Sequence, residues 1–133
     1  MEYYINEGNK IGYLPAEFGE NLTLEQKKLT ASADVVKGQV VEVSGDMTVA
    51  PTSAASAKVL GVAMFDAKSG ENVVVETEGL FKLIASASIT AGDIIESAAD
   101  GKVAKVGGSA VKALGVALNT VTTGGDVYVK FSI

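Results

Sequence analysis

Hydrophobic and polar residues alternate along the chain over short stretches that are separated by glycine-containing turns, a pattern typical of β-strands. The last stretch, residues 126–133, is the clearest example, because every second side chain is apolar. Val127, Val129 and Phe131 would share the inner face of a strand, while the residues between them would face water. The pattern therefore predicts a half-buried strand at this end of the chain.

The same reasoning predicts short strands along most of the sequence. Residues 22–29 could form a strand or a short helix, and we favour a strand with Leu22 and Leu24 pointing inward. The further predicted strands are residues 39–43, 47–50, 58–65, 72–77, 80–85, 93–96, 102–106, 111–119 and 126–133.

An internal repeat organises these strands. When the sequence is shifted by 54 residues, Ala31-Ser32-Ala33 falls on Ala85-Ser86-Ala87, and Leu60-Gly61-Val62-Ala63 falls on Leu114-Gly115-Val116-Ala117. Gly38 and Gly70 fall on Gly92 and Gly124 with the same spacing. We therefore expect an all-β fold, a small β-barrel or sandwich made of two tandem pseudo-repeats with an extended N-terminal arm. The expected parts are the arm at 1–30 and a single β domain at 31–133, with repeat units at about 31–77 and 85–131.

A glycine lies inside the same predicted strand of both units, at Gly61 and Gly115. Glycine in a strand interior usually marks a bulge or a close approach of two backbones. Its presence in both units suggests that they pack around a shared pseudo-twofold core. A kink at a barrel corner would explain it equally well.

The first 30 residues differ from the repeat in composition. They hold half of the aromatic residues of the chain, and four Gly or Pro positions interrupt regular structure there. We interpret this segment as an arm that contacts a partner or a neighbouring subunit, since large rigid rings make good interface anchors. The alternative is that these rings plug one end of the barrel. The expected contact residues are Tyr3, Tyr4, Tyr13, Leu14 and Phe18.

Composition narrows the classes of function. The chain has 11 lysines, no arginine and 16 acidic residues, for a net charge of −5, which argues against binding nucleic acid or an anionic membrane. The start of the sequence lacks the features of a signal peptide, so synthesis and retention in the cytosol are expected, or exit by another route. Cysteine is absent, so no disulfide can form.

The sequence offers little for catalysis. It has neither histidine nor cysteine, so the usual general base and the strongest nucleophile are missing. Serine–lysine combinations occur at Ser53, Ser56 and Lys58 and again at Ser109 and Lys112, but we interpret them as solvated loop residues. The acidic residues are interpreted as surface or turn residues, namely the close pair Glu76 and Glu78 and the repeat-related pairs Glu42/Glu96 and Asp46/Asp100. We expect no enzyme activity, metal, cofactor or small-molecule substrate.

Several of these stretches resemble the capsid cement, or head decoration, proteins of tailed bacteriophages. The resemblance covers about residues 30–133, and its motifs are Leu60–Ala63, Gly70–Phe81, Ile89–Asp93, Leu114–Ala117 and Gly125–Val129. The opening Tyr4-Ile5-Asn6-Glu7-Gly8 is also similar to the start of that family.

The resemblance implies a small β-barrel on the outer surface of the capsid in the virion, made in the host cytoplasm and often trimeric. It would bind the major capsid protein and stabilise the shell. The long aromatic arm departs from the family pattern and leaves room for a related role as the base of a head fibre. A carbohydrate- or surface-binding β module is the alternative function, although Tyr128 is the one Tyr or Trp within the repeats.

Overall fold

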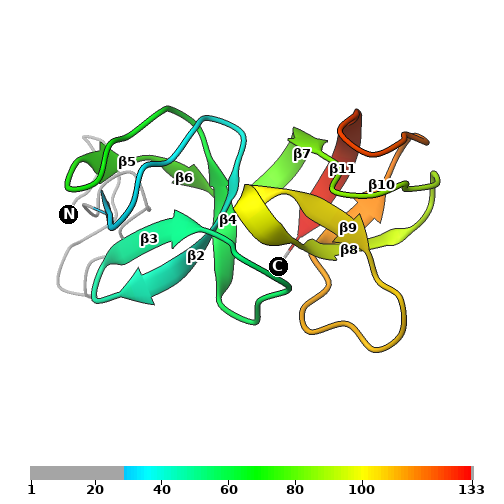
Figure 1. The fold of residues 1–133 in the computed structure, drawn as a ribbon, viewed down its shortest axis with the longest axis horizontal. Helices are drawn as coiled ribbons and strands as arrows, with labels where there is room; N and C mark the ends of the chain where they lie inside the picture. The colour runs from blue at the N-terminus through cyan, green and yellow to red at the C-terminus, as the bar shows by residue number, and fades with distance from the viewer. Residues whose placement is uncertain (1–28, 133) are drawn as a thin grey trace, which may run out of the picture.

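The computed structural model describes residues 29–132 and consists of two β-sheets that lie side by side (Figure 1). The first sheet contains β1 (Leu29–Ala31), β2 (Val40–Gly45), β3 (Thr48–Pro51), β4 (Val59–Ala63), β5 (Asn72–Val73) and β6 (Val75–Glu76). The second contains β7 (Glu78–Ile84), β8 (Ile94–Ser97), β9 (Val103–Lys105), β10 (Gly115–Ala117) and β11 (Asp126–Ser132), with the short 3₁₀ helix η2 (Ala99–Gly101) between β8 and β9. The predicted all-β fold is confirmed.

Each sheet curls so that its edges approach each other. The strand order of the first sheet is β5-β1-β3-β2-β4-β6, and its two edge strands are consecutive in the chain, separated by Val74 alone. The order of the second sheet is β7-β11-β10-β8-β9, and Ala85, just after β7, bridges to Val103 in β9. The first sheet is thus a nearly closed barrel, and the second has the same tendency.

The repeat is visible in the backbone pairing. Val35 bridges Ala67 in the first unit, and Ile89 bridges Val121 in the second, each partner being 54 residues later. The same shift relates the row Val40–Val62–Glu76 across β2, β4 and β6 to the row Ile94–Val116–Lys130 across β8, β10 and β11. The two tandem pseudo-repeats predicted from the sequence therefore fold with the same pairing scheme.

Glycine fixes equivalent turns in both units. Gly38 has a φ of +92° and Gly92 a φ of +95°, a backbone conformation that residues with a Cβ atom rarely adopt. Their N–H groups donate equivalent hydrogen bonds, from Gly38 to the Ala63 carbonyl oxygen (2.9 Å) and from Gly92 to that of Ala117 (2.8 Å). These bonds connect the Gly38 turn to β4, which contains Gly61, and the Gly92 turn to β10, which contains Gly115.

Gly61 and Gly115 allow neighbouring strands to approach closely. A Cβ on Gly115 would collide with the Lys130 carbonyl group on β11, and one on Gly61 would collide with the Glu76 carbonyl group on β6. Each close approach lies within its own unit, so these glycines do not hold the two units together. The predicted pseudo-twofold symmetry of a shared core is wrong, because the buried residues form two clusters and only the larger one contains residues of both units.

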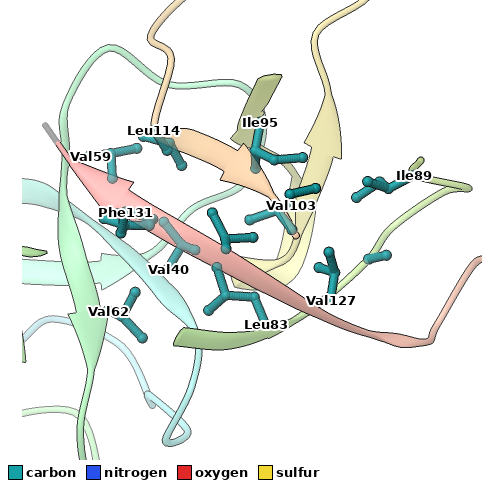
Figure 2. Packing of buried hydrophobic residues seen from close by; sticks show 13 residues of the cluster. Val40, Val59, Val62, Leu83, Ile89, Ile95, Val103, Leu114, Val127 and Phe131 are labelled. Carbon is teal, nitrogen blue, oxygen red and sulfur yellow. The ribbon is translucent and has the colours of Figure 1, made fainter. Parts of the chain in front are cut away.

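The larger cluster joins the units. It is built mainly from the second unit, around Leu83, Ile95 and Phe131, but Val40, Val59 and Val62 of the first unit belong to it as well (Figure 2). In Figure 2 these three valines lie around Phe131. The smaller cluster is confined to the first unit. One face of the first unit is thus buried against the second.

Three of the predicted strands differ clearly from the observed ones. The strand predicted at 111–119 is formed only at Gly115–Ala117, because residues 106–114 make a loop and Val111 is exposed. The strand predicted at 58–65 ends at Ala63, and Phe65 is exposed. The strand predicted at 72–77 is split, since Val73 pairs with β1 whereas Val75 pairs with β4.

The alternation predicted at the end of the chain is confirmed. Val127, Val129 and Phe131 are fully buried, and the residues between them are exposed. The strand predicted at residues 22–29 lies outside the described residues except for Leu29, which begins β1.

Candidate functional site: docking surfaces

The serine–lysine combinations of the first unit have structural partners. The Ser56 hydroxyl donates to the Glu42 carboxylate, and the Ser56 N–H donates to Ser97 Oγ (2.9 Å). The Lys58 N–H donates to Ser56 Oγ (3.0 Å), while Ser53 is exposed in the loop. Ser56 thus links its loop to the second unit, and its hydrogen bonds explain its position without any catalytic role.

The corresponding residues of the second unit are also engaged in the fold. Lys112 Nζ donates to the Val59 carbonyl oxygen of the first unit (3.2 Å), and Glu96 accepts the Val111 N–H (3.4 Å). Asp100 lies in the η2 turn with a φ of 59°. Within residues 29–132 no three acidic side chains come together in a way that could hold a metal ion. No helix in this part of the chain is long and apolar enough to cross a membrane.

Polar side chains form the seam between the two units. Thr52 and Ser97 are the two polar residues in the described part of the chain that are fully buried, at 1% and 2% exposure. The Thr52 hydroxyl donates to the Ala98 carbonyl oxygen (2.8 Å), and the Ser97 hydroxyl donates to that of Ala54 (2.8 Å). Because buried polar groups require partners, these bonds fix how the units sit against each other.

Replacing Thr52 by valine tests the seam. The change keeps the shape of the side chain but leaves the part-buried Ala98 carbonyl oxygen without this donor, so we expect a loss of about 1–3 kcal/mol in the free energy of unfolding. Urea denaturation measures it. Thr123→Val is the matched control, because Thr123 is exposed, and we expect it to change stability by less than about 0.5 kcal/mol. Equal stabilities of the two variants would show that the Thr52 hydroxyl does not hold the seam.

A groove follows the junction of the two units. It has two pockets of about 340 Å³ and 410 Å³, and both are lined by Lys37, Gly38 and Lys82. Apolar side chains contribute to its walls, including Ile84 in the first pocket and Met64 in the second. The groove combines lysine ammonium groups and, in the first pocket, the carboxylates of Asp100 and Asp126 with apolar surface. Such a mixture of charged and apolar groups fits contact with a protein.

The outer face of the second sheet exposes several large apolar side chains. Its first row is Leu80–Lys130–Val116–Ile94 across β7, β11, β10 and β8. Tyr128 lies one step further along β11, opposite Lys82, and its carbonyl oxygen accepts the N–H of Leu118. The apolar members are exposed and stand on the side opposite the core, namely Leu80, Ile94, Val116, Leu118 and Tyr128. We call these five residues the outer apolar face.

The outer apolar face was not among the residues predicted to contact a partner. The predicted contacts Tyr3, Tyr4, Tyr13, Leu14 and Phe18 lie outside the described residues. The alternation along β11 could have predicted that Tyr128 is exposed, because Tyr128 lies between the inward-facing Val127 and Val129. The exposure of Val116 and Ile94 could not be predicted in this way, because the equivalent residues Val62 and Val40 are also β-branched and apolar but are buried.

Comparison with known proteins identifies a family and a solved structure that are similar to this chain. The profile of a family described as phage cement protein matches residues 20–133. Among solved structures, the N base of the head fibre protein gp8.5 of bacteriophage phi29 superposes with a TM-score of 0.61 at 20% sequence identity. The match covers 80% of this chain and 92% of that one, so the two share a fold. A search of curated proteins found no match. Because the family profile spans the whole repeat region, the chain belongs to the phage cement protein family and is a structural protein of the phage capsid.

Proposed function

We propose that the protein decorates the outside of a phage capsid by binding the major capsid protein, and that it stabilises the shell there as a homotrimer. Membership of the phage cement protein family is the observation that carries this proposal. On this proposal the protein is made in the host cytoplasm and ends on the outer capsid surface. It acts without enzyme activity or a cofactor.

The physical properties of the fold suit such a role. Decoration requires a rigid body with contact surfaces, and the two packed clusters and the hydrogen-bonded seam provide rigidity. A trimer that docks at three points gains avidity without any new contact, provided that its geometry lets all three engage at once. Weak contacts of each subunit therefore suffice for stable decoration.

The N-terminal arm supplies the proposed anchors. Tyr3, Tyr4, Tyr13, Leu14 and Phe18 would become buried against the capsid or a neighbouring subunit. Burial of apolar area contributes about 25 cal/mol per Å², whereas ordering costs about 1–2 kcal/mol per residue. Only large anchors offset that cost, which is why the aromatic residues are the proposed contacts.

Serine substitutions in the arm test this proposal. In the full chain, replacing Tyr3, Tyr4, Tyr13, Leu14 and Phe18 together by serine should weaken capsid binding at least tenfold, because the anchors lose their apolar area. Cosedimentation of purified protein with capsids that lack it measures the affinity. Phe65→Ser is the control, since Phe65 is an exposed ring outside the arm, at 63% exposure.

The outcomes separate the parts of the proposal. Unchanged binding of the serine variant would refute the arm contacts while leaving capsid decoration intact. Failure of the unaltered protein to cosediment with capsids, or to raise their heat stability, would refute decoration itself. The alternative of a carbohydrate-binding module gains no support, because the two pockets of the groove contain a single aromatic residue, Phe81.

A further inference from the structure

The two units expose equivalent surfaces to different extents. In the first unit the row Val40–Val62–Glu76 crosses three neighbouring strands, and Val40 and Val62 are 0% and 2% exposed. In the second unit the equivalent residues Ile94 and Val116 are 46% and 38% exposed. Equivalent positions of the two units are therefore buried in the first unit and exposed to solvent in the second.

The cover over the first unit is the second unit itself. Val40 and Val62 belong to the cluster that contains Phe131 and Leu114, so their side chains leave the first barrel and enter the core of the next one (Figure 2). This contact joins two copies of one fold unit through different surfaces, which makes it a head-to-tail contact. Nothing among residues 29–132 covers the corresponding surface of the second unit.

The open surface is extended by further apolar side chains. Leu118 and Tyr128 are 52% and 46% exposed, whereas their equivalents Met64 and Val74 in the first unit are partly buried. Leu80 flanks the same row on β7 and is also exposed. Lys130 lies between Leu80 and Val116 in this row, and the other exposed members of the face are apolar. Groups of exposed apolar side chains that are bordered by polar residues mark interaction sites on soluble domains.

We propose that the outer apolar face binds a second copy of this chain. A fold unit that buries Val40 and Val62 in its neighbour within the chain presents Ile94 and Val116 in the same arrangement to a neighbour in another chain. Because head-to-tail contacts produce rings when the rotation closes, this face also provides a route to a closed trimer. The inference deepens the homotrimer part of the proposed function and rests on it in that respect.

Light scattering on the full chain tests the face. The unaltered chain should have a mass of two or more times 13.6 kDa, and Val116→Asp should reduce it to 13.6 kDa at the same concentration, since a carboxylate would have to lose its hydration in an apolar contact, even with Lys130 beside it. The matched control is Val111→Asp, because Val111 is 55% exposed and lies in the loop before β10, and its mass should equal that of the unaltered chain. Amide NMR spectra of both variants would verify that they remain folded.

A thiol measurement gives a second, independent result. The chain has no cysteine, so Val116→Cys and Val111→Cys each provide a single probe. At concentrations where copies associate, the thiol at position 116 should react at least tenfold more slowly with a maleimide than the thiol at position 111. Dilution to the monomer should remove the difference.

Three results would overturn the inference. They are a monomeric unaltered chain, an undiminished mass for Val116→Asp, and equal labelling of the two thiols under associating conditions. An undiminished mass for Val116→Asp together with a monomer after deletion of residues 1–18 would assign the subunit contact to the arm instead. Cosedimentation with capsids is measured separately, so a monomeric chain that still binds capsids would overturn this inference but not decoration.

Discussion

Replacing Phe131 by alanine should cost about 3–5 kcal/mol in the free energy of unfolding, the range expected for removing a fully buried aromatic ring. The ring is 0% exposed and packs edge-to-face on Phe81, with 5.6 Å between ring centroids and an interplanar angle of 84°. It also lies among valines of the first unit, so the substitution empties space at the junction of the two units. Because small domains are stable by only about 5–15 kcal/mol, such a loss is a large fraction of the total.

Urea denaturation of the unaltered chain and of Phe131→Ala measures this loss in the free energy of unfolding. Phe65→Ala removes the same atoms from an exposed ring in the same fold and is the matched control, with an expected change within about 0.5 kcal/mol. Similar midpoints for the two variants would contradict the assigned role of Phe131 in joining the units.

Gly115→Ala should be nearly as damaging, with an expected loss of about 3 kcal/mol or more. The new methyl group would meet the Lys130 carbonyl group and stand 3.2 Å from Phe131 Cα, and both are backbone atoms that a rotamer change cannot move. Strands β10 and β11 would have to separate, at a cost that reaches or exceeds the usual range for overpacking. Loss of their register would also displace Val129 and Phe131 from the core.

Thermal or urea unfolding compares Gly115→Ala with Gly107→Ala. A Cβ on Gly107 meets no atom within 4 Å, so that substitution should leave stability nearly unchanged. If Gly115→Ala unfolds at the same urea concentration as the unaltered protein, the close approach of the two strands cannot be a constraint on the fold.

Much of the fold could be predicted because its main features are periodic in sequence. Alternation fixed the inward residues of β11, and the 54-residue shift predicted that the two units share a pairing scheme. Strand ends were less predictable: Val111 has a strand-forming side chain but no partner strand, so it lies in a loop. Propensity is overridden wherever pairing partners are missing.

The surfaces could be predicted only in part. Thr52 and Ser97 look like ordinary loop and strand residues, yet they are buried in the seam. Their one distinguishing sequence property is that they break the repeat, since Thr52 falls on Val106 and Ser97 falls on Val43. At these two positions the departure from the repeat coincides with the contact between the units.

The seam also bears on how the chain avoids misfolding. Because the two units share one pairing scheme, a strand of one unit could pair in the equivalent position of the other. Such misassembly is a typical failure of repeat proteins. The hydroxyl groups of Thr52 and Ser97 find their acceptors only when each unit occupies its own place. Exchange of equivalent strands between the two units would separate these hydroxyl groups from their acceptors, at about 1–3 kcal/mol for each group left buried and unpaired. The non-repeated hydrogen bonds thus favour correct assembly of a chain whose repeated strands would permit several.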